Sequence, residues 1–156
     1  MKYWKMVDAE HAGAVARGSF RLGVLQDYAA LEAGGGAGGP ASQPFWALCL
    51  SEVGCDHDPR PGPPKAIFEI SDVEVLMRYL TGAHARPIAG ARGGPVLYAA
   101  QPTAVDDDQA PFRKDPRFAG EREFRLVFQP RPGVAVEGPI VTRPDYAIAA
   151  LLTRVS

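Results

Sequence analysis

The stretch "EREFRLVFQP", residues 121–130, has large apolar side chains at every second position from residue 124 and ends in a proline. Because successive side chains of a strand point to opposite faces, Phe124, Leu126 and Phe128 would share one face, which belongs in a hydrophobic core. The opposite face would carry two acids and a base in a row, Glu121, Glu123 and Arg125, followed by Val127. The pattern therefore predicts a strand over residues 121–130 with a buried apolar face and a charged second face.

The charged face of this strand is compatible with two functions. In one, the face is solvated, as the outer face of an antiparallel sheet usually is, and Glu123 and Arg125 form a weak surface pair. In the other, the strand begins at the edge of a cleft, where Glu121 and Glu123 stabilise positive charge that develops on a sugar ring. The sequence leaves both interpretations open, and the glutamate pair is the leading candidate for a reactive centre.

The rest of the chain contains further strand and helix patterns. Apolar or alternating segments predict strands at residues 2–7, 18–25, 45–53, 65–70, 95–101 and around 138–142. Helical spacing and capping residues predict short helices from Asp8 to Ala16 and at residues 25–33, 73–80 and 145–155. Ser71 or Asp72 would cap the third of these helices, and Asp145 would cap the last. The apolar face of the third helix would consist of Val73, Leu76, Met77 and Leu80.

The length and composition indicate one globular domain. With 156 residues, of which 46% are hydrophobic and 22% charged, the chain can bury a core of its own. We expect a single α+β domain over residues 1–156, with a mixed, mainly antiparallel sheet of about six or seven strands and about three or four short helices. The 17 glycines and 15 prolines predict long irregular connections, and we expect flexible loops at residues 34–44 and 54–64.

The charge and the N-terminal sequence bear on partners and location. The formal net charge of -1 does not indicate nucleic-acid binding, and the strongest local basic excess, at residues 113–125, is small. The first residues lack the apolar region of a signal peptide, and no apolar run reaches the roughly 18 residues that a membrane helix needs. We therefore expect a cytoplasmic protein without a membrane partner. The abundance of Ala, Gly, Pro and Arg suggests a bacterial source.

Three other clusters resemble known kinds of binding site in composition but lack the surrounding sequence that such sites require. The glycines of residues 34–39 match a G-x-G-x-x-G pattern, but no predicted strand leads into them. Cys49 together with residues 55–58 lacks the spacing of a common zinc motif. A run of aspartates such as residues 106–108 more often caps a helix or is hydrated than binds a metal ion. We therefore expect no bound metal, and we expect Cys49 and Cys55 to be free thiols.

The segment "EREF", residues 121–124, resembles the E-x-E element of the arginine-serine-glutamate type of ADP-ribosyltransferases. Proteins of that superfamily also have an arginine on an early strand and a serine on a middle strand. The order is matched here by Arg21, Ser51 and Glu123. The motif around Ser51 reads Leu-Ser-Glu where the family usually has Ser-Thr-Ser, and Arg17 is an alternative match for the arginine.

This resemblance implies an ADP-ribosyltransferase-like fold, an activity, and a role for each matched residue. NAD would be the substrate, and the acceptor would be a macromolecule, a small molecule or water. Glu123 would stabilise the positive charge that develops on the nicotinamide ribose, and Glu121 would orient the acceptor. The other residues implied to bind NAD are Arg21 at the pyrophosphate, Ser51 as a hydrogen-bond partner of Glu123, and Tyr98 or Trp4 as a stacking ring.

A second resemblance covers more of the chain, about residues 3–128. The segments "FRLGVLQDYAALE" and "ALCLSE" and the closing E-x-E-[aromatic]-R pattern resemble an uncharacterised bacterial domain family of unknown function. This family implies no activity, so the alternative hypothesis is a binding or regulatory module with the same fold and without chemistry. In such a module the Glu-x-Glu face would meet a partner through polar contacts.

Overall fold

The computed structural model describes residues 2–25, 45–52, 64–99 and 110–155. Within them the protein has an α+β structure, in which a mainly antiparallel sheet is accompanied by few and short helices. The predicted fold class is confirmed at this level, although these residues form ten strands rather than about six or seven. The predicted helix 25–33 and the predicted loops 34–44 and 54–64 lie outside the described residues, apart from Leu25 and Pro64.

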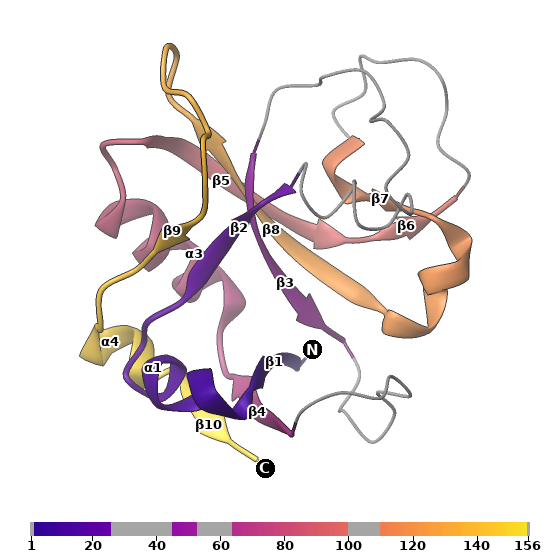
Figure 1. The fold of residues 1–156 in the computed structure, drawn as a ribbon, viewed down its shortest axis with the longest axis vertical. Helices are drawn as coiled ribbons and strands as arrows, with labels where there is room; N and C mark the ends of the chain where they lie inside the picture. The colour runs from indigo at the N-terminus through magenta and orange to yellow at the C-terminus, as the bar shows by residue number, and fades with distance from the viewer. Residues whose placement is uncertain (1, 26–44, 53–63, 100–109, 156) are drawn as a thin grey trace.

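The elements follow one another in the order shown in Figure 1. The strands are β1 (Tyr3–Asp8), β2 (Arg21–Val24), β3 (Trp46–Ser51), β4 (Lys65–Ile70), β5 (Ile88–Pro95), β6 (Leu97–Tyr98), β7 (Arg113–Lys114), β8 (Glu123–Pro130), β9 (Ile140–Val141) and β10 (Leu152–Arg154). The α-helices are α1 (Ala12–Ala16), α3 (Val73–Ala83) and α4 (Tyr146–Ala149). The described segments also contain three 3-10 helices, η1 (Ala9–His11), η2 (Ala110–Phe112) and η3 (Pro116–Glu121).

The sheet is organised on β3. One edge of β3 pairs with β8 along its whole length, from Trp46 opposite Phe128 to Ser51 opposite Glu123. The other edge is shared, because β2 pairs with the end near Trp46 and β1 pairs at Ser51. The sheet therefore forks at β3 into a branch β1-β4-β10 and a branch β2-β9, while β5 lies beyond β8 on the other side.

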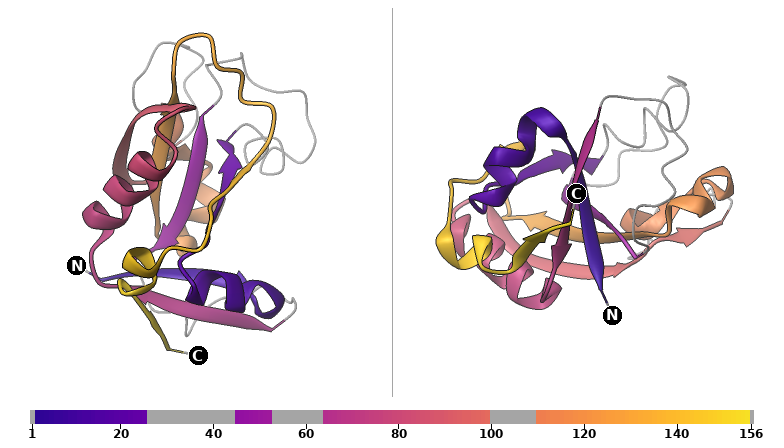
Figure 2. Two further views of the ribbon diagram at one scale, coloured as in Figure 1. Left: turned by 90° about the vertical axis from the view of Figure 1, so that its left-hand side faces the viewer. Right: turned by 90° about the horizontal axis from the view of Figure 1, so that it is seen from below.

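The core lies between the two branches. In the left view of Figure 2, β1 and β4 run across the molecule while β3 is nearly upright, so the branches face the interior from different directions. The largest fully buried side chains come from β2 and the residues before it, from β3, β4, β5 and β8, and from helices α3 and α4; they include Phe20, Leu22, Leu48, Phe68, Leu76, Leu80, Ile88, Leu126, Phe128 and Ile148. The fork thus allows one hydrophobic core to be covered by a single, strongly bent sheet.

Several sequence predictions are confirmed in detail. Phe124, Leu126 and Phe128 belong to the hydrophobic core. The predicted strands at 2–7, 45–53 and 65–70 correspond to β1, β3 and β4. In α3 the predicted apolar face packs against the core, and the Asp72 side chain accepts a hydrogen bond from the Val75 backbone N–H, as expected for a cap.

The predicted strand at 95–101 differs from the structure. A long strand, β5, ends at Pro95, and only Leu97–Tyr98 of the predicted segment forms a strand. A Cβ atom at Gly93 would lie 3.0 Å from Leu126 Cδ2 and 3.1 Å from Phe124 Cε1, so glycine allows β5 to approach these large side chains closely. The sequence of β5, "IAGARGGP", has no apolar alternation from which a strand could be predicted.

Two helix predictions are corrected in part. Asp8 does not cap the helix that follows it, because its Oδ1 accepts a hydrogen bond from Lys65 Nζ at 2.5 Å and its side chain makes no cap contact. Asp145 does cap α4, through hydrogen bonds from the backbone N–H groups of Ala147 and Ile148. The helix nevertheless ends at Ala149 instead of continuing to residue 155, since β10 pairs with β4.

At Gly18 the chain that follows the N-terminal helix α1 comes close to the C-terminal helix α4. The φ of Gly18 is 78°, and a Cβ atom built there would lie 2.2 Å from the Asp145 carbonyl oxygen and 2.9 Å from the Ala149 nitrogen. In addition, the Asp145 N–H donates a hydrogen bond to the Arg17 carbonyl at 3.0 Å. Only glycine satisfies both the left-handed backbone and this close backbone approach.

We therefore expect Gly18→Ala to lower the free energy of unfolding by about 3 kcal/mol or more, from backbone strain together with the steric clash. The matched control is Gly133→Ala, because Gly133 has φ 79° and open space around its Cβ position. It should cost only the strain, about 1 kcal/mol. Urea unfolding of the three proteins measures both values, and equal losses in the two variants would contradict the proposed close contact.

Candidate functional site

Glu123 lies at the centre of a buried ionic network at the start of β8. Its carboxylate accepts hydrogen bonds on both oxygens, at Oε1 from Arg125 Nε and at Oε2 from Lys114 Nζ, 2.9 Å away. The side chains of Glu123, Arg125 and Lys114 are only 6%, 4% and 7% exposed. A buried charge is tolerated when its partners are buried with it, so each of these three side chains depends on the others.

The structure corrects the position of Glu121, which does not belong to the strand. Glu121 ends η3, and Arg122, with φ 42° and ψ 57°, turns the chain before β8 begins at Glu123. The two glutamates are still close together, but through a shared contact and not through alternate positions on one strand. Lys114 Nζ donates a hydrogen bond to Glu121 Oε2 at 2.6 Å as well as to Glu123, so one ammonium bridges both carboxylates.

Lys114 is the residue of this network that the sequence did not single out. It lies on β7, a two-residue strand that pairs in parallel with β6, and its ammonium is 4.9 Å from the centre of the Phe118 ring. The only signal for it was the basic excess at residues 113–125. Which basic residue meets Glu123 depends on how the chain folds back between β7 and β8, and no local pattern shows that.

Arg125 fixes the segment that covers this face of β8. Its Nη1 donates a hydrogen bond to the carbonyl of Pro111 at 3.0 Å, and the neighbouring Phe112 is buried. Val127, further along the same face, is 1% exposed. The interpretation of this face as a solvated surface is therefore wrong, because the strand is buried on both sides.

The environment of Glu123 keeps its carboxylate ionised. Burial by itself would raise the pKa of Glu123, because a charge is costly in the interior. The charge of Arg125 and hydrogen bonds from Arg125, Cys49 and Lys114 outweigh this effect and lower the pKa to about 2. Glu123 is therefore a carboxylate, not a carboxylic acid, at any pH near neutrality.

Three residues proposed from the sequence lie on the strands beside Glu123. Ser51 is its direct partner across the β3–β8 ladder, and the Ser51 hydroxyl donates a hydrogen bond to the Glu121 carbonyl at 3.3 Å. Trp4 is the partner of Ser51 on the opposite edge of β3, which places it on the same face of the sheet. The Tyr98 hydroxyl accepts a hydrogen bond from the Glu123 backbone N–H at 2.7 Å. The structure thus brings Ser51, Trp4 and Tyr98 to one place.

Arg21 lies on the same face of the sheet, further from the network. The register of β2, β3 and β8 places Arg21, Ser51 and Glu123 on one face of three strands that are neighbours in the sheet. They share it with the directly paired residues Gly23, Ala47 and Val127. Arg21 is exposed, whereas Glu123 is buried. Arg17, the alternative match, is exposed and follows α1 outside the sheet.

Cys49 of β3 lies beside the network, and Lys5 of β1 contacts the Cys49 backbone. Cys49 is a free thiol opposite Arg125 in the ladder. Burial, followed by the charge of Glu123, raises the pKa of this thiol to about 12. Lys5 Nζ donates a hydrogen bond to the Cys49 carbonyl at 3.0 Å, and burial lowers the pKa of Lys5. The thiol is therefore protonated and lacks the thiolate that a nucleophile requires.

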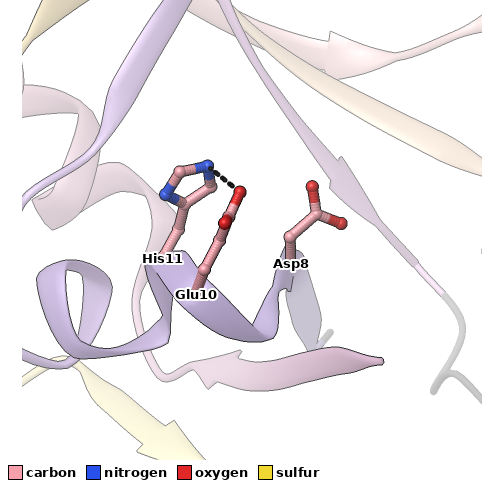
Figure 3. Close-up of side chains that lie close together, drawn as sticks. All are labelled: Asp8, Glu10 and His11. Atoms are coloured by element: carbon pink, nitrogen blue, oxygen red, sulfur yellow. Dashed lines mark ion pairs between the residues drawn. The ribbon is translucent and has the colours of Figure 1, made fainter. Parts of the chain in front are cut away.

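A separate polar cluster lies at the end of β1 and in η1. Asp8, Glu10 and His11 each place a possible ligand atom within 4.8 Å of the others (Figure 3). His11 Nε2 is 3.4 Å from Glu10 Oε1, and Asp8 Oδ1 is bonded to the ammonium of Lys65. Because Lys65 competes with any cation for Asp8, we assign no metal to this cluster.

No protein-family model, curated protein or solved structure matches the chain. Among the helices of the described segments, none has the length and apolar character needed to cross a membrane.

The pKa of Glu123 predicts a specific acid sensitivity. Because this pKa is about 2 in the folded protein and 4.5 ordinarily, ionised Glu123 stabilises the fold fully above about pH 4.5. That contribution, on the order of 3 kcal/mol, should be lost as the pH falls toward about 2. Urea unfolding at a series of pH values measures the decrease.

The variant Glu123→Gln should lack this part of the pH dependence. It should also be less stable near neutral pH by about 3 kcal/mol or more, since it leaves buried Lys114 and Arg125 without their anion. Glu74→Gln, at an exposed position in α3, is the control and should behave like the unchanged protein. If Glu123→Gln kept the same slope between about pH 4.5 and 2, the assignment to Glu123 would be wrong.

The raised pKa of Cys49 predicts a slow thiol. In a Cys55→Ser protein, which leaves Cys49 as the only cysteine, a disulfide reagent at about pH 8 should react at least 100-fold more slowly in the folded state than in urea. The reason is that the thiolate, which is the reactive form, is scarce at this pH and the sulfur is shielded. Absorbance of the released thiol follows the reaction, and equal rates in both states would exclude a buried, protonated Cys49.

Proposed function

We propose that this protein binds NAD and acts as an ADP-ribosyltransferase or NAD glycohydrolase. The observation that supports the proposal most is the arrangement of Arg21, Ser51 and Glu123 on one face of three neighbouring strands. The arrangement was suggested by a resemblance in sequence, and it depends on a strand register that the sequence could not show. Trp4 and Tyr98 lie beside Ser51 and Glu123.

Each residue would have a role suited to its chemistry. The exposed guanidinium of Arg21 would bind the pyrophosphate, which a planar fork of donors fits well. Glu123, which is ionised, would stabilise positive charge on the ribose as nicotinamide leaves. Partly exposed Trp4 and Tyr98 offer aromatic faces for a base or for the nicotinamide ring.

The exposure of these residues indicates the direction from which a substrate would approach. The Glu121 side chain is 27% exposed, whereas Glu123 and Lys114 are nearly covered. A ligand would therefore enter past Glu121 and reach Glu123 behind it. The same order agrees with a role for Glu121 in orienting the acceptor and for Glu123 in stabilising the ribose.

One observation favours a second candidate, a binding or regulatory module without chemistry. Both carboxylate oxygens of Glu123 are hydrogen-bonded by cations of the protein itself. A carboxylate held in this way can serve the fold alone, as buried ion networks do in many proteins. In that case Trp4, Arg21 and Glu121 would form a polar surface for a partner.

NAD binding separates the two candidates. We expect calorimetry to detect NAD binding, and Arg21→Gln to weaken it about tenfold or more, because a charge-assisted contact to phosphate is lost. Arg86→Gln, at an exposed position after α3, is the control and should bind as the unchanged protein does. Nicotinamide release from NAD, followed by chromatography, should be strongly reduced in a folded Glu123→Gln protein.

If the unchanged protein neither binds NAD nor releases nicotinamide, the transferase proposal fails and the module remains. If NAD binds but Arg21→Gln and Arg86→Gln bind it with the same affinity, Arg21 does not bind the pyrophosphate. Because Glu123→Gln also affects stability, circular dichroism at the assay temperature has to show that the variant is folded before its activity is compared.

A further inference from the structure

The position of Lys114 relative to the two glutamates carries an inference about the acceptor. We infer that Lys114 is itself an acceptor, so that the protein ADP-ribosylates its own Lys114 side chain. This inference rests on the proposed function and identifies the acceptor class as a primary amine. The observation behind it is the bridging ammonium, 2.6 Å from Glu121 Oε2 and 2.9 Å from Glu123 Oε2.

The geometry gives Lys114 the place that an acceptor has to occupy. Glu123 is the group proposed to stabilise charge on the ribose, and Glu121 is the group proposed to orient the nucleophile. A nucleophile must lie within reach of both, and Lys114 Nζ is hydrogen-bonded to both. Its side chain is 7% exposed, so the amine is held in position and shielded from water, which would otherwise compete as acceptor.

The chemistry of the transfer balances with the groups present. The ammonium of Lys114 gives one proton to the Glu121 carboxylate, which is in hydrogen-bond contact with it. The lone pair of the resulting amine forms a bond from Nζ to the anomeric carbon of the ribose. The bond from that carbon to the nicotinamide nitrogen breaks, and its electron pair stays with nicotinamide, which leaves as a neutral molecule. The transfer needs no oxidant, reductant or further reactant.

The structure also indicates how the transfer would be limited. Once an ADP-ribosyl group is attached, Lys114 can no longer fit between two carboxylates as a compact ammonium, because the Phe118 ring lies 4.9 Å from its nitrogen and Tyr98 is its neighbour on β6. The modified side chain would therefore leave through the more exposed side, past Glu121. A single transfer per molecule is the expected stoichiometry.

The test starts from the unchanged chain of 156 residues. After incubation with NAD, intact-mass spectrometry should show the addition of one ADP-ribosyl group, and peptide fragmentation should locate it on Lys114. Lys114→Gln should lose this addition, whereas Lys2→Gln, at an exposed lysine paired with Glu69, should retain it. Glu121→Gln should reduce the addition about 100-fold by loss of the proton acceptor, while NAD binding is retained.

The outcomes distinguish the inference from the proposed function. Nicotinamide release without a modified Lys114 would overturn the inference and leave the proposed function standing. The absence of NAD binding in calorimetry would overturn both. Equal labelling when free ADP-ribose replaces NAD would show non-enzymatic glycation and would also overturn the inference. An ADP-ribosyl group located on Lys114 after incubation with NAD, and absent after incubation with free ADP-ribose, supports the inference even if Lys114→Gln proves too unstable to compare.

Discussion

The structure around the candidate site depends on one constraint, the burial of the Glu123 carboxylate. An ionised group in the interior needs cations beside it, and these come from Arg125 on β8 and Lys114 on β7. Each cation also holds another segment of the chain in place, because Arg125 donates a hydrogen bond to the Pro111 carbonyl and Lys114 donates one to Glu121. The segment from η2 to η3 is thus held on the face of the sheet largely by polar contacts of these two cations, in contrast to the opposite face, where Phe124, Leu126 and Phe128 pack in the hydrophobic core.

The parts of the fold with regular apolar spacing could be predicted from the sequence. β3 follows from a nearly continuous apolar run, and β4, β8 and α3 follow from alternation or from helical spacing with a capping aspartate. β5 could not be predicted, because its glycines serve close packing against Leu126 and give no apolar signal. The segment that forms β10 was predicted as part of a helix, because its strand conformation results from pairing with β4, which is distant in the sequence. In each failure, a tertiary contact outweighs the local preference.

Most members of the candidate site were predictable, with the exception of Lys114, but their arrangement was not. The sequence pointed to Glu121, Glu123 and Ser51, and the structure brings them together with Trp4 and Tyr98. Alternation predicted a shared strand face for the glutamates, but the left-handed turn at Arg122 removes Glu121 from the strand, and Lys114 restores the contact from another element. That contact depends on the chain reversal between β7 and β8, which has no signature in residue spacing.

The two cations of Glu123 belong to strands that are paired to different extents. Arg125 belongs to β8, which is paired on both edges, with β3 and with β5. Lys114 belongs to β7, which is held to β6 by a two-residue parallel pairing. A small displacement of β7 would therefore withdraw one counterion while the main sheet stays intact. The network of two glutamates and two basic residues would then change from electrically neutral to singly negative, and an incoming positively charged group would find a vacant, already oriented anion in place of the lysine.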